Sequence, residues 1–419
     1  MSEMSGSAAL EGSTANPATA TPTTARLPLA GLLALTMCSF IATANESVPA
    51  GLLPQMARDF GVSQGWAGQL ATLCALGSGL AAIPLTIAMR GWRRRAALLL
   101  AVGGFLLCNA ITAWSPYYAL TLGARFMAGI ATGLAWSLLA GYARRMVAPA
   151  LQGRAMAVAM VGIPLALALG VPLSAWLGAL AGWRAVFGVL SGMSLALMLW
   201  VARRVPDYPG QAAARRTPMR QVWRTPMRQV WRTPGVRPVL AVILAWILAH
   251  YTLYTYIAPL MAAFGLAARV DAVLLVFGVA SLGGIWMTGM LVDRGLRPLV
   301  LASLALFALV ALALGHGATS TGAVFAAIAL WGLSFGGAPT LLQTALADAA
   351  GDGADVAQSM LVTVFNLAFA AGGAIGGVVL ETAGAPALPR TIVVLLAVAL
   401  AVAWRARHHG FVAGRRRAA

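Results

Sequence analysis

Two charged residues lie well inside apolar stretches of the sequence, and they are the first candidates for chemistry. Glu46 precedes Pro54 by eight residues, and Arg125 follows Tyr117 by eight residues. A charge in the middle of a membrane helix costs roughly 2.5–3.5 kcal/mol even on the most lenient scale, so its presence calls for a role. A carboxylate can carry a proton when desolvation and a nearby guanidinium oppose each other in setting its pKa.

The spacing of these two charges predicts that they lie at one depth. If Pro54 and Tyr117 mark the outer ends of two membrane helices, both charges lie about 12 Å below that surface, because a helix rises about 1.5 Å per residue. We therefore expect Glu46 and Arg125 to interact. Two roles fit such a pair: proton coupling in a carrier, or a structural ion pair, which at best breaks even when buried.

A second set of polar side chains lies in the other half of the chain. Trp246, His250 and Tyr254 are spaced i, i+4 and i+8 and share one helical face. This stripe suits a cavity that binds amphipathic solutes by stacking and hydrogen bonds, although packing between helices predicts the same spacing. His250 follows Glu46 by 204 residues and is a second candidate for proton coupling, because imidazole titrates near neutral pH.

The elements that position these residues must be membrane helices. Of the 419 residues 60% are hydrophobic and 10% are charged, against about 25% charged in soluble domains. A membrane span needs about 20 apolar residues. Twelve apolar runs are long enough, at residues 27–53, 66–89, 96–114, 117–142, 155–181, 186–201, 238–264, 270–291, 298–316, 322–346, 356–380 and 388–404. The sequence predicts an all-α integral membrane protein of two six-helix bundles.

The basic residues predict how the chain is oriented. All 29 are arginine, and the net charge is +18. In a soluble chain this charge would favour nucleic acid as a partner, but these arginines lie between apolar runs, so we expect no nucleic acid. Alternate connections hold 24 of them and the opposite connections hold 4. Because basic residues stay on the cytoplasmic side, we expect both termini inside the cell.

Composition divides the chain into five parts. We expect a disordered cytoplasmic tail at 1–26, a bundle at 27–201, a basic linker at 202–237, a second bundle at 238–404 and a basic cytoplasmic tail at 405–419. The linker contains a tandem octapeptide, Arg216–Trp223 repeated as Arg224–Trp231. The repeat could lie on the anionic inner leaflet, or it could be a tolerated duplication.

The two bundles also share short sequence matches. Phe60-Gly61-Val62 recurs as Phe264-Gly265-Leu266, 204 residues later. A Gly-xxx-Gly pair at 129 and 133 matches the pair at 332 and 336, 203 residues later. One offset of about half the chain predicts parallel repeats, with a substrate site between them near the middle of the membrane.

One connection resembles a known family. The segment Gly289-Met-Leu291-Val-Asp293-Arg294-Gly-Leu-Arg297 is similar to the cytoplasmic signature of the major facilitator superfamily. In the first half, Met89 stands where the acid of this signature belongs. The resemblance implies an inner latch, in which an acid and arginines bond to a neighbouring helix end. The latch residues would be Arg90, Arg93, Asp293, Arg294 and Arg297.

Further segments resemble the drug:proton antiporter branch of that family, which includes bacterial sugar, arabinose and purine-nucleoside efflux carriers. They are Asn45–Pro54, Phe60–Ser63, and Asn366 ahead of a glycine-rich run. Arg125 and Gly129 are similar to an R-x-x-x-G segment whose arginine is associated with proton transfer. The fifth run looks like the antiporter Gly/Pro motif, with Gly162, Pro164, Gly170, Pro172 and Gly178, but it lacks the adjacent Gly-Pro pair.

Together these features predict a monomeric carrier that uses the proton gradient, needs no cofactor or metal and contacts membrane lipids. It would export a sugar, nucleoside or drug-like solute across the bacterial inner membrane by alternating access. Candidate cavity residues are Asn45, Trp136, His250, Tyr254, Gln343 and Asn366. A proton-coupled uptake carrier and a non-transporting receptor are alternatives. An enzyme is disfavoured because no nucleophile, base and acid converge in the sequence.

Overall fold

The computed structural model describes residues 27–148, 151–210, 226–316 and 320–412. The expected tail at 1–26 and the first copy of the octapeptide lie outside these residues. Throughout the described ranges the chain is helical and contains no strand. Eleven of its helices are long and apolar enough to cross a membrane. With α2, which runs beside α4 and α17, they make the twelve crossings that the sequence predicts.

The first bundle contains six crossings, of which the fifth is divided into four segments. Its helices are α1 (Leu29–Phe60), α2 (Gln64–Ala88), α3 (Arg94–Trp114), α4 (Tyr118–Arg145), α5 (Gln152–Met160), α6 (Gly162–Leu165), the π-helix η3 (Ala166–Gly170), α7 (Val171–Ala181) and α8 (Trp183–Arg204).

The second bundle follows the short helix α10 and has two divided crossings. After α10 (Pro226–Arg232), its helices are α11 (Val236–Tyr254), α12 (Ile257–Ala263), α13 (Val270–Leu291), α14 (Leu296–Gly315), α15 (Thr321–Gly336), α16 (Ala338–Ala350), α17 (Ala354–Ala383) and α18 (Ala387–Arg405). The seventh crossing breaks between α11 and α12, and the tenth breaks at Gly337 between α15 and α16.

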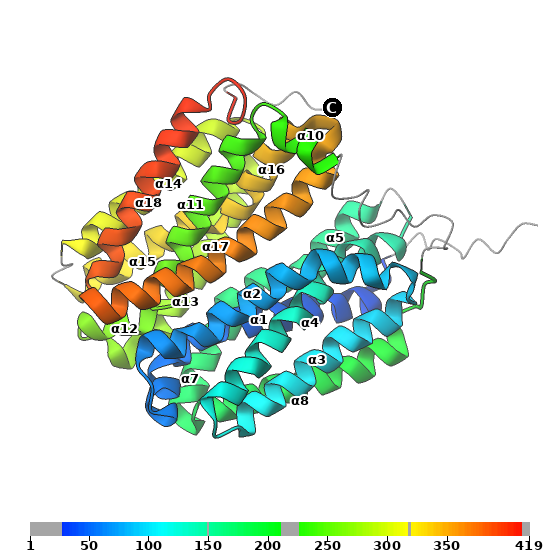
Figure 1. The fold of residues 1–419 in the computed structure, drawn as a ribbon, viewed down its shortest axis with the longest axis horizontal. Helices are drawn as coiled ribbons and strands as arrows, with labels where there is room; N and C mark the ends of the chain where they lie inside the picture. The colour runs from blue at the N-terminus through cyan, green and yellow to red at the C-terminus, as the bar shows by residue number, and fades with distance from the viewer. Residues whose placement is uncertain (1–26, 149–150, 211–225, 317–319, 413–419) are drawn as a thin grey trace, which may run out of the picture.

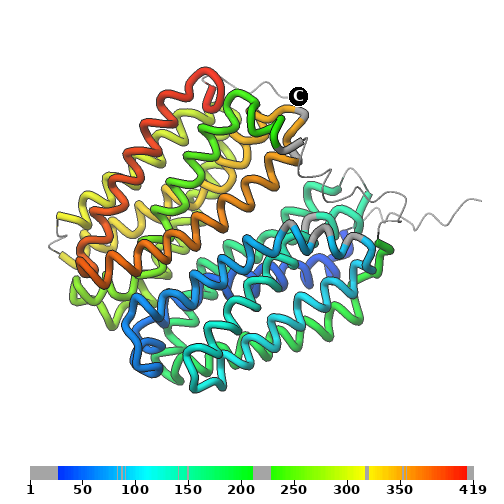
Figure 2. The backbone as a smooth tube through the Cα atoms, in the orientation of Figure 1, coloured from blue at the N-terminus to red at the C-terminus, as the bar shows by residue number. Residues whose placement is uncertain are grey.

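The two bundles meet at one end and spread apart at the other. Figures 1 and 2 show them converging near α7 and α12 and diverging toward α5 and α10. At the converging end the Gly65 N–H donates to Glu381 Oε1 over 2.8 Å, and the Tyr256 hydroxyl donates to the Gly373 carbonyl over 2.7 Å. The first of these bonds joins the two bundles directly, and the second fixes Tyr256 of the seventh crossing against α17, beside Gly65.

The glycine pairs of the two halves make equivalent contacts. Gly129 of α4 packs directly on the Cys74 carbonyl of α2, and Gly332 of α15 packs in the same way on the Phe277 carbonyl of α13. The second glycines of the two pairs do the same on Ser78 and Ser281. Each contact in one half therefore recurs 203 residues later in the other half. Small residues allow two helix backbones to approach this closely.

The short turn matches are also structurally equivalent. Gly61 ends α1 with φ +63°, and Gly265 ends the seventh crossing with φ +74°. Residues with a Cβ rarely adopt this left-handed conformation, which is why glycine stands at both positions. The amides that follow close the same bond, from Val62 to the Ala57 carbonyl and from Leu266 to the Met261 carbonyl.

The Gly/Pro motif of the fifth crossing produces an irregular helix. Its π-helical segment, η3, lies between Pro164 and Pro172, each of which lacks an amide hydrogen for the helical ladder. Gly162, Gly170 and Gly178 face α1, where an added Cβ would meet the Thr36 carbonyl, the Phe40 ring and the Leu52 side chain. The three glycines therefore let the fifth crossing pack closely against α1.

We expect Gly129→Ala to destabilise the first bundle, because its Cβ would collide with the Cys74 backbone. Overpacking of this kind usually lowers the free energy of unfolding by about 1–3 kcal/mol. Gly123→Ala in the same helix is the matched control, since nothing lies within 4 Å of its added Cβ. Thermal unfolding of the detergent-purified variants should show a lower midpoint for the first only. Equal midpoints would contradict the packing argument.

Candidate functional site

Arg125 lies at the centre of the first bundle and is completely buried. Its guanidinium donates to the Asn45 carbonyl of α1 over 3.2 Å and to Asn109 Oδ1 of α3 over 2.8 Å. The guanidinium carbon also lies 4.9 Å from the centre of the Phe187 ring of α8. One charge from α4 therefore joins three other helices, and carbonyl oxygens and a ring face replace its hydration.

Glu46 follows Asn45 on α1, so the two charges share one level of the bundle. The expected direct ion pair between Glu46 and Arg125 is not formed, and in this respect the prediction is wrong. The guanidinium bonds instead to the backbone carbonyl of Asn45, one residue before Glu46, and to Asn109 Oδ1. The side chains of Ser78 on α2 and Trp136 on α4 lie near the Glu46 carboxylate.

Ten buried side-chain nitrogen and oxygen atoms of the described residues have no hydrogen-bond partner, and all of them fall into two groups. The charged group, in the first bundle, is Asn45, Glu46, Ser78, Asn109 and Arg125. The aromatic group, in the second bundle, is Trp246, His250, Tyr254 and Trp331. Buried polar groups are usually hydrogen-bonded, so the concentration of these atoms at two places makes both groups candidate sites.

His250 lies inside the aromatic group and is 3% exposed. Its ring stacks on Phe335 with centroids 3.4 Å apart and on Tyr254 with centroids 5.3 Å apart. Trp331 lies 5.3 Å from the same imidazole. In this conformation the stripe of Trp246, His250 and Tyr254 packs between helices, which is the alternative that its spacing also allowed.

Tyr251 is a site residue that the stripe did not include. It follows His250 but faces the first bundle, where its phenol lies close enough to Glu46 for an electrostatic interaction. Its ring stacks on Phe369 of α17 with centroids 3.5 Å apart. No sequence pattern singled it out, because its offset of 205 from Glu46 differs from the 203–204 of the repeat and the stripe does not include it.

The remaining cavity candidates are dispersed. Asn366 is 8% exposed and lies where α17 crosses α2, with its Cβ against Gly79. Its amide nitrogen donates to the Val362 carbonyl over 2.9 Å. Trp136 is half-buried beside Glu46, whereas Gln343 lies exposed on α16. The structure thus brings Trp136 to the charged group.

The inner latch differs between the two halves. Arg93 bonds to Asp207 with 2.5 Å between Nε and Oδ2, and Asp207 Oδ1 also accepts from the Arg95 amide over 3.2 Å. Asp207 lies at the start of the linker, so the linker supplies the acid that Met89 lacks. Slight burial raises the pKa of Asp207, but the Arg93 hydrogen bond and the arginine charges outweigh this, so the pKa lies below its ordinary value.

In the second half the latch bonds to the end of α18. Arg297 donates to the carbonyls of Ala403, Trp404 and Phe411 over 3.0–3.1 Å. Asp293 and Arg294 lie exposed in the turn after α13. The side chain of Arg90 lies outside the described residues. Bonding of Arg297 to a neighbouring helix end matches the arrangement that the family resemblance implies.

Within the described residues no three His, Cys, Asp or Glu side chains are close enough to hold a metal ion. Cys38, Cys74 and Cys108 are buried free thiols. Cys74 Sγ lies 3.9 Å from the Asn45 carbonyl and thus belongs to the surroundings of the charged group.

Comparisons with known proteins agree with this fold. The profile of the Major Facilitator Superfamily matches residues 35–373. The purine ribonucleoside efflux pump NepI of Escherichia coli strain K12 is 28% identical over 342 residues, which cover 81% of this chain and 84% of the pump. The same pump from E. coli O6:H1 strain CFT073 is 30% identical over 347 residues, with the same coverage.

Solved structures have the same architecture. The crystal structure of the D-xylose-proton symporter aligns with a TM-score of 0.69 at 16% identity and covers 92% of this chain and 98% of its own. A bacterial homologue of the human lysosomal transporter Spinster, in an inward-facing and unoccupied conformation, aligns with a TM-score of 0.68 at 14% identity and the same coverage. This chain belongs to the Major Facilitator Superfamily, a family of membrane transporters.

A double-mutant cycle tests the bond between Arg125 and Asn109. Arg125→Met leaves Asn109 Oδ1 without its donor, and Asn109→Leu leaves the guanidinium short of one acceptor. We expect the double variant to be more stable than the sum of the single losses predicts, by about 0.5–3 kcal/mol. Chemical denaturation in detergent measures this coupling energy. Strict additivity would show that the bond contributes nothing.

Asp207→Asn should release the start of the linker from the first bundle. Because Arg93 is mostly exposed, the ion pair contributes up to about 1 kcal/mol, and trypsin should cleave the linker arginines about two- to fivefold faster. Asp271→Asn, at the start of α13, is the control. Since the pKa of Asp207 is lowered, the ion pair with Arg93 is present at neutral pH. It is lost when the pH falls through this lowered pKa, because the carboxylate is then protonated. Unchanged cleavage would contradict the latch.

Proposed function

We propose that this chain is a proton-coupled secondary transporter that exports a small organic solute across the bacterial inner membrane by alternating access. One observation carries the proposal. Glu46 lies within α1 with an unpartnered Oε1, directly after the residue whose carbonyl bonds Arg125 and near the Tyr251 phenol of the other bundle. An acid in this position changes neighbours when the bundles rock, so it can take up a proton on one side and release it on the other.

Arg125 supplies a fixed positive charge beside this acid. It holds the Asn45 carbonyl, the residue before Glu46, and thereby also sets where α1 places the carboxylate. Tyr251 and His250 stand on consecutive positions of α11, one toward Glu46 and one in the aromatic group. A movement of α11 that is coupled to the charge of Glu46 would therefore also move the aromatic group.

The arginine distribution supports the orientation of the carrier. The 24 arginines of the alternate connections include those of the linker, of the turn after α13 and of the tail after α18, which assigns these segments to the cytoplasm. This is the end at which the bundles spread apart in Figure 1. On this orientation the carrier is closed on the outside and faces inward, the conformation in which the Spinster homologue was solved.

A purine ribonucleoside is the first solute class to test, because relatives at 28–30% identity are purine ribonucleoside efflux pumps. The unpartnered groups suit such a solute chemically. Indole, imidazole and phenol rings can stack on a planar base, and their N–H and O–H groups can bond to its edge. Asn45, Trp136 and Asn366 add polar contacts from three further helices. Sugars and drug-like solutes are the remaining classes.

Reconstituted vesicles with an acidic lumen test both coupling and direction. A proton antiporter should accumulate a labelled purine ribonucleoside inside the vesicles as protons leave. A proton-coupled uptake carrier should accumulate it only when the outside is acidic, and a receptor should bind it without moving it. A screen that includes sugars and cationic dyes covers the other classes. No movement of any solute in either gradient would overturn the proposal.

Glu46→Gln should abolish accumulation driven by the pH gradient, because the amide cannot release a proton. Exchange of labelled for unlabelled solute across the vesicle membrane should persist, since rocking does not require the acid. Asp271→Asn is the matched acid-to-amide control and should transport like the wild type. A Glu46→Gln protein that still concentrates solute against its gradient would eliminate Glu46 as the coupling acid.

A further inference from the structure

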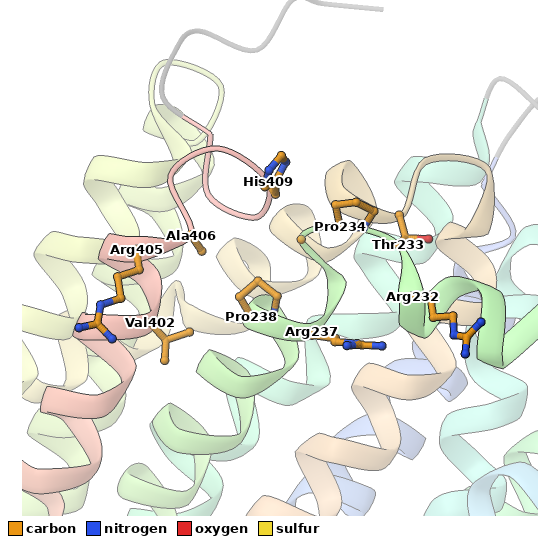
Figure 3. A pocket seen from close by; sticks show the side chains of 10 residues that line it. Arg232, Thr233, Pro234, Arg237, Pro238, Val402, Arg405, Ala406 and His409 are labelled. Atoms are coloured by element: carbon orange, nitrogen blue, oxygen red, sulfur yellow. The ribbon is translucent and has the colours of Figure 1, made fainter.

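A basic pocket lies at the end of the second bundle that carries α10 and the C-terminal segment. It has a volume of about 530 Å³ and lies where the start of α11 meets the end of α18 (Figure 3). Arg232, Arg237, Arg405 and His409 line it, together with Thr233, and no acid is among its lining residues. In Figure 3, Arg232 and Arg405 stand on opposite sides, with Arg237 between them and His409 above.

Part of the pocket lining is apolar. Pro238, Val402 and Ala406 form this part of the lining. Two tryptophans flank it, Trp231 at the end of α10 and Trp404 at the end of α18, with exposed fractions of 46% and 65%. Exposed tryptophans concentrate where acyl chains meet headgroups, which favours headgroup depth for a pocket beside two of them.

The walls of the pocket are fixed by backbone contacts. Gly235 adopts φ +95° and packs directly on the His409 carbonyl, where no other residue would fit. Arg297 bonds to the carbonyls of Ala403 and Phe411, and the Phe411 side chain is fully buried. The turn after α18 is therefore held against the start of α11. The pocket is built into the fold and is not a gap between loose ends.

The charge of the pocket is suited to a phosphate. Arg237 donates from Nε to the Trp231 carbonyl over 3.0 Å, and its guanidinium carbon lies 5.6 Å from the centre of the Trp231 ring. This contact orients one guanidinium, while Arg232 and Arg405 are exposed and free to turn inward. The pocket also lies at the N-terminal end of α11, a 19-residue helix whose macrodipole favours anions there.

We propose that this pocket binds the phosphate headgroup of an anionic phospholipid of the inner leaflet. The two acyl chains would lie past Val402 and between the flanking tryptophans, and the phosphate would lie among the three guanidinium groups. The second copy of the tandem octapeptide then has a role, since it ends at Trp231 and provides most of α10. Bound lipid would join the linker to α18 and to the rim of the second bundle.

The test compares the purified protein with phosphatidylglycerol, with phosphatidylcholine and with inorganic phosphate, by native mass spectrometry and thermal unfolding. Phosphatidylglycerol should bind and raise the unfolding midpoint, and phosphatidylcholine should do neither. The triple variant Arg232→Gln, Arg237→Gln, Arg405→Gln should weaken phosphatidylglycerol binding at least about tenfold. Removing three exposed arginines of the first bundle, with Arg144→Gln, Arg154→Gln and Arg203→Gln, is the matched control and should leave binding unchanged.

A second variant keeps every charge and fills the pocket. Ala406→Trp should weaken phosphatidylglycerol binding to a similar degree. If the triple arginine variant does not fold, this variant still tests whether the lipid binds in the pocket. Equal losses in the control triple would overturn the proposal, because binding would then follow total charge. Equal binding of phosphatidylcholine would overturn it too, and so would a midpoint raised by inorganic phosphate alone, which would assign the pocket to a soluble anion.

Discussion

The burial of one guanidinium is the constraint around which the first bundle is organised. Arg125 is removed from water at the centre of four helices, so each of its neighbours must offer it an acceptor or a ring face. This requirement draws in the Asn45 carbonyl from α1, the Asn109 amide from α3 and Phe187 from α8. Glu46, the next residue of α1, lies at the same level, and its Oε1 has no hydrogen-bond partner.

The two bundles share a backbone plan and differ in chemistry. The glycine contacts between α4 and α2 recur between α15 and α13, 203 residues later. The left-handed turns at Gly61 and Gly265 are likewise equivalent and lie 204 residues apart. The unpartnered atoms do not repeat in kind. Charged and amide groups lie in the first bundle, and aromatic donors lie in the second.

The inner face is organised by segments that connect or follow the bundles. Asp207 of the linker takes the place of an acid missing from the first-half signature, and Arg297 bonds the chain that leaves α18. The start of the linker is therefore part of the folded first bundle at its inner end, and the chain after α18 is part of the second. The basic pocket of Figure 3 exists only because the chain after α18 is fixed in this way.

The sequence alone determined the twelve crossings, the internal repeat and the level of the two buried charges, because apolar length, periodicity and offset are local properties that a single chain displays. Tertiary structure decided the partners. Arg125 bonds the Asn45 carbonyl and Asn109 instead of Glu46, Arg93 bonds Asp207 across 114 positions, and Tyr251, which no sequence pattern singled out, lies near the acid. These outcomes depend on how each helix is rotated about its axis against its neighbours, and a rotation of about 100° exchanges one residue for the next.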